Sequence, residues 1–245
     1  MKAPVAVALD APDLATATSW ARAVAPYVST LKVGLELYYR YGAAAVEQVR
    51  GDAGLFLDLK LHDIPNTVAG AARAVAHLRP DFLTVHAAGG PAMIAAAVQA
   101  LPDCRIVGVT VLTSLSQADV AAVGWAGSPL DVTRRLAVLA VGAGARALVC
   151  SPQEVAAVRA EVGEGVYLIT PGVRPVAAGG TAPGSRTGVG VEGGVGGGVG
   201  TDDQARVATP ARALADGADL LVIGRPITGS ADPGAAAAAL ARSLA

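Results

Sequence analysis

Residues 54–63 read GLFLDLKLHD, a short apolar strand pattern that ends in a dense run of charged residues. Similar apolar runs recur along the chain, and a longer stretch with helical spacing of its apolar residues follows each one. The sequence therefore predicts strands that alternate with helices. The runs that we interpret as strands are 5–9, 31–34, 54–60, 82–86, 105–112, 146–150, 166–170 and 219–223.

Helices are expected in the intervening stretches. Eight strands that alternate with eight helices predict an α/β fold, a (β/α)8 TIM barrel, and the 245 residues fit one such domain spanning 1–245. An open doubly wound sheet is the competing architecture. The expected helices lie near 13–25, 36–50, 66–78, 91–100, 129–143, 152–162, 209–217 and 233–244, with N-cap candidates Asp13, Asn66 and Ser151 and first-turn prolines Pro91, Pro129, Pro152 and Pro210.

The composition excludes several classes of partner. A formal net charge of −1 and the absence of a basic run argue against nucleic acid and anionic membrane surfaces. No apolar stretch is long enough for a membrane span, and the first residues lack the pattern of a signal peptide. Cys104 and Cys150 show no metal-binding spacing, which is typical of free thiols in a reducing compartment. We therefore expect a cytoplasmic protein.

A glycine-rich segment interrupts the alternation. Residues 173–207 contain no strand or helix pattern, and Gly179–Gly200 is dominated by glycine. Loops of this length in a compact domain are usually functional or disordered. We interpret the segment as a phosphate lid between the seventh strand and its helix, with a low-complexity expansion as the alternative. The spacing of Gly188, Gly190 and Gly193 matches a dinucleotide fingerprint, but it follows no strand and is discounted.

Charged side chains gather where the third strand ends. Asp58 and Lys60 are two residues apart and should share one face of that strand, while Lys32 lies on the neighbouring strand and Asp63 follows shortly after. Catalytic groups of (β/α)8 barrels lie at these carboxyl ends. A lysine held cationic between carboxylates can stabilise a carbanion and then protonate it. The alternative is an ion-pair network that only ties strands together.

The same residues carry a family resemblance. Asp58-x-Lys60-x-x-Asp63-Ile64-Pro65-Asn66-Thr67 resembles the D-x-K-x-x-D-I-P-x-T signature of the orotidine 5′-monophosphate decarboxylase family. The likeness covers nearly the whole chain. It includes Leu9-Asp10, Leu31-Lys32-Val33-Gly34, Val109-Thr110-Val111-Leu112-Thr113-Ser114, Thr170-Pro171-Gly172-Val173-Arg174-Pro175, Asp202-Asp203-Gln204 and Ile223-Gly224-Arg225-Pro226-Ile227.

The resemblance implies decarboxylation of orotidine 5′-monophosphate to uridine 5′-monophosphate and CO2 in de novo pyrimidine biosynthesis, without a cofactor or metal ion. It also implies a homodimer in which each subunit contributes Asp63 to its partner's site. The implied catalytic residues are Lys60, Asp58, Lys32 and Asp63. The implied substrate contacts are Asp10 to ribose, Thr113 and Pro171 to the pyrimidine, Gln204, Gly224 and Arg225 to phosphate, and Ile64 and Thr67 at the partner's site.

Some features fit the family less closely or have no assigned role. The glycine-rich stretch before Gln204 looks longer than the family's usual phosphate lid. His62 and His86 are expected to hydrogen-bond behind the charged residues, and Arg174 either approaches the phosphate or forms a structural ion pair.

Two rival functions remain at this point. Metal-dependent sugar-phosphate decarboxylases and aldolases of related barrels share D-x-K-x-x-D but place a glutamate on the second strand as a Mg²⁺ ligand. This chain has Lys32 there, and its ammonium would repel a cation. The other rival is a barrel that binds phosphate ligands without catalysis.

Overall fold

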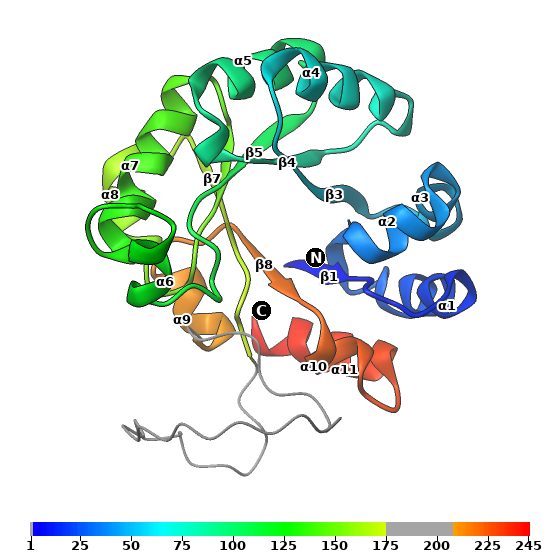
Figure 1. The fold of residues 1–245 in the computed structure, drawn as a ribbon. Helices are drawn as coiled ribbons and strands as arrows, with labels where there is room; N and C mark the ends of the chain where they lie inside the picture. Colours follow the sequence, from blue (N-terminus) through cyan, green and yellow to red (C-terminus); the bar gives the residue numbers. More distant parts are fainter. Residues whose placement is uncertain (1, 175–207) are drawn as a thin grey trace, which may run out of the picture.

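The computed structural model describes residues 2–174 and 208–245, which form a closed barrel of eight parallel strands in sequence order. Figure 1 looks along the barrel, with the strands inside a ring of helices. The predicted (β/α)8 fold is therefore confirmed. The strands are β1 (Ala3–Ala8), β2 (Val28–Gly34), β3 (Gly54–Leu61), β4 (Phe82–His86), β5 (Arg105–Val109), β6 (Ala147–Val149), β7 (Tyr167–Thr170) and β8 (Leu220–Ile223).

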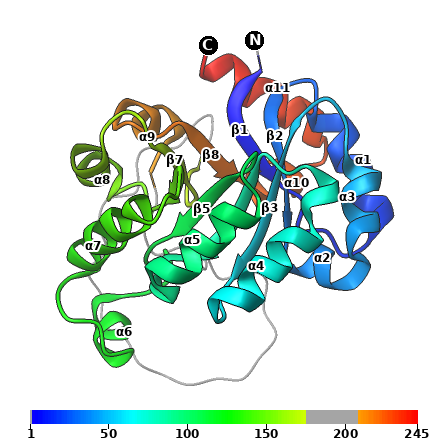
Figure 2. The same ribbon diagram turned by 90° about the horizontal axis from the view of Figure 1, so that it is seen from above.

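The helices of the described residues form the outer layer of the barrel. Figure 2, turned by 90°, shows that both chain termini lie at the same end. The helices are α1 (Leu14–Val24), α2 (Leu35–Tyr41), α3 (Ala43–Val49), α4 (Pro65–Ala74), α5 (Pro91–Ala100), α6 (Gln117–Ala122), α7 (Pro129–Gly142), α8 (Val155–Val162), α9 (Pro210–Ala215), α10 (Arg225–Thr228) and α11 (Pro233–Ser243), with short 3-10 turns at Ala76–Leu78 and Ala87–Gly89. None of these helices is long and apolar enough to cross a membrane.

Alternate strand residues divide the core into two parts. One set points outward and packs against the helices, as Leu57 and Leu83 do. The other set fills the barrel interior, where Phe56 and Phe82 lie with ring centroids 5.6 Å apart. Such packing closes a barrel to solvent except near the strand ends. Phe56 also lines the cavity described below, so the packed interior forms its floor.

Several predicted helix limits are wrong, each for a local reason. The helix expected at 36–50 is two helices, because Gly42 between them has φ +59°. Asn66 is not an N-cap, since α4 already begins at Pro65. Ser151 is not one either: its N–H donates to the Glu154 carboxylate at 2.9 Å, and α8 begins only at Val155, well after Pro152.

Other helix signals are confirmed. Asp13 caps α1 by accepting a hydrogen bond from the Thr16 N–H at 2.8 Å. Pro91, Pro129 and Pro210 each stand in the first turn of a helix. Helices α6 and α10 were not expected from the sequence, because each is too short to show a helical period.

The glycine-rich segment falls almost wholly outside the described residues. Val173 and Ala208, which flank it, pair as an isolated parallel bridge. Residues 175–207 are not described, so Gln204 and the predicted lid lie outside the part of the chain that the structure describes. Both stay predictions.

Candidate active site

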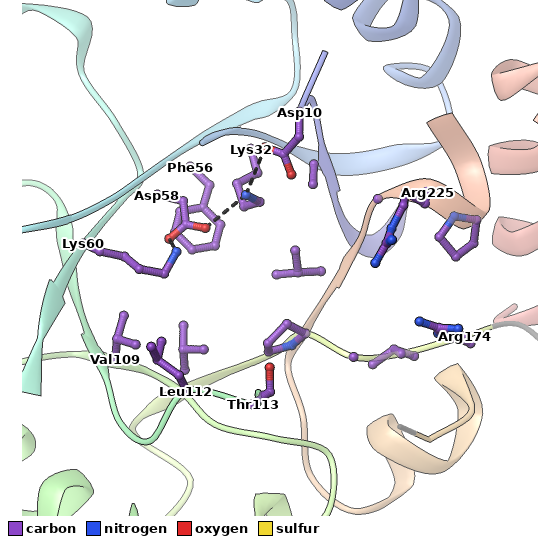
Figure 3. A pocket seen from close by; sticks show the side chains of 18 of the residues that line it. Asp10, Lys32, Phe56, Asp58, Lys60, Val109, Leu112, Thr113, Arg174 and Arg225 are labelled. Carbon is purple, nitrogen blue, oxygen red and sulfur yellow. Dashed lines mark hydrogen bonds and ion pairs between the residues drawn. The ribbon is translucent and has the colours of Figure 1, made fainter. Parts of the chain in front are cut away.

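A cavity of about 610 Å³ lies at the carboxyl ends of the strands. Figure 3 shows that Lys32, Asp58 and Lys60 project into it from one side, and Arg174 and Arg225 from another. Five further sequence-predicted site residues line the cavity besides these three charged ones. They are Asp10, Thr113, Pro171, Gly224 and Arg225, whereas Gln204 is outside the described residues.

Arg174, for which the sequence left two roles open, also lines the cavity. It extends from the end of β7, whereas Arg225 begins α10 directly after β8. Both guanidinium groups are at the opposite side of the cavity from Lys60 (Figure 3). The loops after the seventh and eighth strands are a recurrent phosphate site in (β/α)8 barrels. This end of the cavity is therefore suited to an anionic group of the ligand.

The Asp58 carboxylate is the centre of a row of ion pairs at the other end. Its Oδ2 lies 3.0 Å from Lys32 Nζ, and its Oδ1 lies 2.7 Å from Lys60 Nζ. Lys32 Nζ is also 3.7 Å from Asp10 Oδ1, which adds a second carboxylate to the row. The Lys32 side chain is only 8% exposed and that of Asp58 13%, while Lys60 retains 29%. Lys60 is thus the more accessible of the two lysines to a ligand.

The close pairing keeps the buried groups charged. Burial alone would lower the pKa of Lys32, but the carboxylates of Asp58 and Asp10 together raise it above its ordinary value. Burial would likewise raise the pKa of Asp58, whereas Lys32 and Lys60 lower it to about 2. At neutral pH the cavity therefore holds Asp58 as a carboxylate between two ammonium groups.

The backbone of Lys60 departs from strand geometry. We expected the Asp58 and Lys60 side chains to meet because they alternate along a regular strand, and this reason is wrong. Lys60 has φ +48°, in the left-handed region, and the register of β3 on β4 shifts between Leu57 and Leu61. A non-glycine residue in that region costs about 1–2 kcal/mol. The Asp58 and Lys60 side chains therefore meet because the backbone of β3 is irregular between them. Backbone strain of this kind is often found at functional sites.

Thr84 on β4 is a site residue that the sequence reasoning missed. Its Oγ1 accepts a hydrogen bond from the Lys60 N–H at 2.8 Å and donates one to Asp58 Oδ1 at 3.2 Å. The residue is completely buried. A single threonine within an apolar strand gives no signal of this role, because its partners are brought to it by the shifted register.

Asp63, Ile64 and Thr67 are exposed and do not line the cavity of their own chain. Asp63 Oδ1 accepts a hydrogen bond from the Ile64 N–H at 2.6 Å, and Ile64 is 67% exposed. Within the described residues, no cation forms an ion pair with the Asp63 carboxylate. One chain therefore does not bring Asp63 together with the other three predicted catalytic residues.

His62 and His86 lie beside the charged row, with ring centroids 5.3 Å apart. Burial lowers the pKa of His86, and the neighbouring His62 and Lys60 lower it further. His86 is therefore neutral at physiological pH. Neither imidazole lines the cavity, and their expected hydrogen bonding behind the charged residues stays a prediction.

Comparison with known proteins decides the family. A sequence model of the orotidine 5′-phosphate decarboxylase / HUMPS family matches residues 3–196 and 182–240. The chain belongs to this family. The chain is 67% identical over 246 residues to the orotidine 5′-phosphate decarboxylase of Thermobifida fusca, with 100% of this chain and 97% of that protein covered.

Further members of the orotidine 5′-phosphate decarboxylase / HUMPS family resemble the chain over its length. The orotidine 5′-phosphate decarboxylase of Frankia casuarinae is 55% identical, with 99% of this chain and 88% of that protein covered. The crystal structure of the enzyme of that name from Lactobacillus acidophilus has a TM-score of 0.79 and 32% identity, and 98% of each chain is covered. The Lactobacillus acidophilus structure shares the fold of this chain, and all three proteins are similar to it in sequence.

Proposed function

We propose that this chain decarboxylates orotidine 5′-monophosphate to uridine 5′-monophosphate and CO2, a step of de novo pyrimidine biosynthesis. The observation that carries the proposal is the Lys32–Asp58–Lys60 row in a cavity whose other side presents Arg174 and Arg225. A nucleotide that places its phosphate at the arginines would direct its pyrimidine toward the row. The 67% identity to the Thermobifida fusca enzyme supports the same substrate.

The chemistry explains why a row of charges is needed. Loss of CO2 from C6 leaves an electron pair in an sp² orbital that the ring cannot delocalise. Without an electron sink, stabilisation must come from charges fixed in the site before the reaction. Lys60 is the accessible cation, so it would lie at C6, stabilise the carbanion and then transfer a proton from Nζ to that carbon.

Asp58 would lie near the departing carboxylate. Two like charges about 4 Å apart repel by roughly 4 kcal/mol at an effective dielectric constant of 20. Release of CO2 relieves this repulsion and so favours the forward step. Lys32 Nζ lies 3.0 Å from the other carboxylate oxygen, Asp58 Oδ2. This ion pair keeps Asp58 oriented while the bond between C6 and the carboxylate breaks.

The remaining contacts follow from the same orientation of the substrate. Asp10, at the end of β1, would accept hydrogen bonds from the ribose hydroxyls, and Thr113 and Pro171 would contact the pyrimidine. Arg225 and the Gly224 N–H would bind the phosphate. Gln204 would add a phosphate contact from the residues that the structure does not describe. Phosphate binding then supplies energy that can be used to orient the reacting ring.

We further propose that the site is completed in a homodimer. Asp63 would enter the partner's cavity as the second carboxylate beside Lys60, and Ile64 and Thr67 would lie with it. The exposure of these residues, which is 67% for the apolar Ile64, supports an interface there. A cytoplasmic location is also part of the proposal, and it is supported by Cys104 and Cys150, which are buried thiols.

The test is an assay of purified protein treated with EDTA, in which the absorbance of orotidine 5′-monophosphate is followed. The proposal predicts full turnover after chelation. Activity that is lost with the metal would favour a metal-dependent enzyme instead. Tight binding of uridine 5′-monophosphate with no CO2 release would identify a binding barrel. Within the described residues, no three His, Cys, Asp or Glu side chains are grouped to hold a metal ion.

A further inference from the structure

We infer that Thr84 is a positioning residue for the decarboxylation, and that its hydroxyl holds Lys60 and Asp58 in the arrangement that the reaction needs. The inference rests on the function proposed above. It concerns a residue that does not line the cavity and would not touch the substrate. Thr84 would act through the two charged residues that do.

The irregular pairing of β3 and β4 creates the need for such a residue. Leu57 pairs with Leu83 and Leu61 with Val85, so β3 advances by four residues where β4 advances by two. The two additional residues on β3 form a bulge, and such features re-aim side chains next to active sites. Lys60 lies in this bulge with φ +48°. Its N–H donates a hydrogen bond to a side chain, with Thr84 Oγ1 as the acceptor at 2.8 Å.

The hydrogen bonds around Thr84 form a closed loop through Lys60. The Lys60 N–H donates to Thr84 Oγ1, which donates to Asp58 Oδ1 at 3.2 Å. The same Oδ1 accepts from Lys60 Nζ at 2.7 Å. One hydroxyl can serve both functions, since it offers a donor and acceptor lone pairs. The backbone and the ammonium of Lys60 are thus tied together through one threonine oxygen and one carboxylate oxygen.

Loss of the hydroxyl should affect the chemical step more than binding. Thr84 is completely buried, so no water can take the place of its hydroxyl. The Lys60 N–H would then have no hydrogen-bond acceptor. The left-handed backbone would then relax and move the ammonium relative to C6, and displacements of about 1 Å can cost on the order of 100-fold in rate. Arg174 and Arg225, at the other side of the cavity, would be unchanged (Figure 3).

The experiment compares Thr84→Val, which removes the hydroxyl at nearly constant shape, with Thr84→Ser, which keeps it. We expect Thr84→Val to lower kcat about 10- to 100-fold while KM changes by less than about threefold. Thr84→Ser should retain kcat within about threefold of the unmodified protein. Thr133→Val is the matched control, because Thr133 is also fully buried but its hydroxyl has no hydrogen-bond partner in the described part of the chain, and its kcat should be unchanged.

Two results would overturn the inference. One is a folded Thr84→Val protein with unchanged kcat, and the other is an equal loss of kcat in Thr84→Ser and Thr84→Val. If Thr84→Val does not fold, Thr84→Ala takes its place, with the same expected loss relative to Thr84→Ser.

Failure of the proposed function would be recognised separately, because the unmodified protein would then release no CO2. The structural part of the inference, that the Thr84 hydroxyl holds Lys60 and Asp58 in their arrangement, would in that case be decided by crystal structures. Thr84→Val, but not Thr84→Ser, should return φ of Lys60 to negative values or separate its Nζ from Asp58 Oδ1. An unchanged Lys60 would overturn it.

Discussion

Asp58 is the residue on which the charges of the site depend. Its two oxygens form ion pairs with Lys32 and Lys60. Without Asp58 the two ammonium groups would face each other, and Asp10 would be the only carboxylate left that forms an ion pair with them within the described residues. Lys32 is 8% exposed and has little access to compensating water. Removing one partner from a buried ion pair leaves the other charge uncompensated, which is strongly destabilising.

Asp58→Asn should therefore lower the free energy of unfolding by about 3 kcal/mol at pH 7. Since the pKa of Asp58 is lowered to about 2 in the folded chain, its contribution is complete above about pH 4 and is lost as the pH falls toward 2. The stability difference between the two proteins should thus shrink over that interval. Urea unfolding between pH 7 and 2 measures it.

The control for this experiment is Asp52→Asn, which changes an exposed carboxylate that should contribute less than about 0.5 kcal/mol. A difference between Asp58→Asn and the unmodified protein that stays constant from pH 7 to pH 2 would contradict the assignment of a charged, ion-paired Asp58.

The sequence reveals the charged residues of the site but not the way in which they are held. Asp58, Lys60 and Lys32 stand out because charges at strand ends are costly unless they are used. The left-handed backbone of Lys60 and the hydrogen bonds of Thr84 depend on how β3 and β4 pair. Pairing of neighbouring parallel strands is a long-range property, so a local pattern such as strand alternation cannot reveal a bulge.

Among the elements, the junction of β2 and α2 has a direct effect on the site. Gly34 ends β2 and lies beside Asp58 in the sheet register. A Cβ at this position would lie 2.5 Å from Asp10 Oδ1 and 3.2 Å from Lys32 Nζ. The strand end can therefore approach these two side chains only because it carries no side chain of its own.

Gly34→Ala should displace the Asp10 carboxylate and weaken its 3.7 Å ion pair with Lys32. We expect kcat/KM to fall about 10- to 100-fold, because small displacements in a preorganised site are costly. Steady-state kinetics with orotidine 5′-monophosphate measures the effect. Gly51→Ala, where the new Cβ would meet no atom within 4 Å, is the control and should leave kcat/KM unchanged. Equal kinetics for the two variants would contradict this account of Gly34.

The sequence predicts the number of strands correctly, but it predicts the first and last residues of the helices less well. All eight predicted strands are present. They could be predicted because each is an apolar run that precedes a stretch with helical spacing. The helix limits fail where one residue acts locally, as Gly42 does with its φ of +59° between α2 and α3. The short helix α6 is held by a capping box of Ser116 and Asp119, a signal present in the sequence that we did not use.

At the scale of the whole molecule, the proposed dimer makes each site depend on two chains. A subunit would contribute Lys60 to its own cavity and Asp63 to that of its partner. The dimer could not be worked out from strand patterns, because the role of Asp63 comes from the family resemblance alone. The exposed position of Asp63 agrees with a residue that acts outside its own chain.

A mixing experiment tests this arrangement. Lys60→Ala and Asp63→Ala proteins should each have very low activity, but a heterodimer of the two contains one site with both residues intact. Random exchange of subunits puts half of the chains in heterodimers, so an equimolar mixture should regain about a quarter of the unmodified activity. Each variant mixed with itself is the control. No recovery after demonstrated subunit exchange would contradict shared sites.

The measurement that tests the central claim most directly is the turnover of orotidine 5′-monophosphate by chelator-treated Lys60→Ala and unmodified protein, compared under saturating substrate. The account predicts that the unmodified protein keeps its full kcat without metal. It also predicts that Lys60→Ala, which lacks both the cation at C6 and the proton donor, loses at least about 1,000-fold in kcat. Near-normal turnover by Lys60→Ala would contradict the proposal that fixed charges centred on Lys60 stabilise the carbanion.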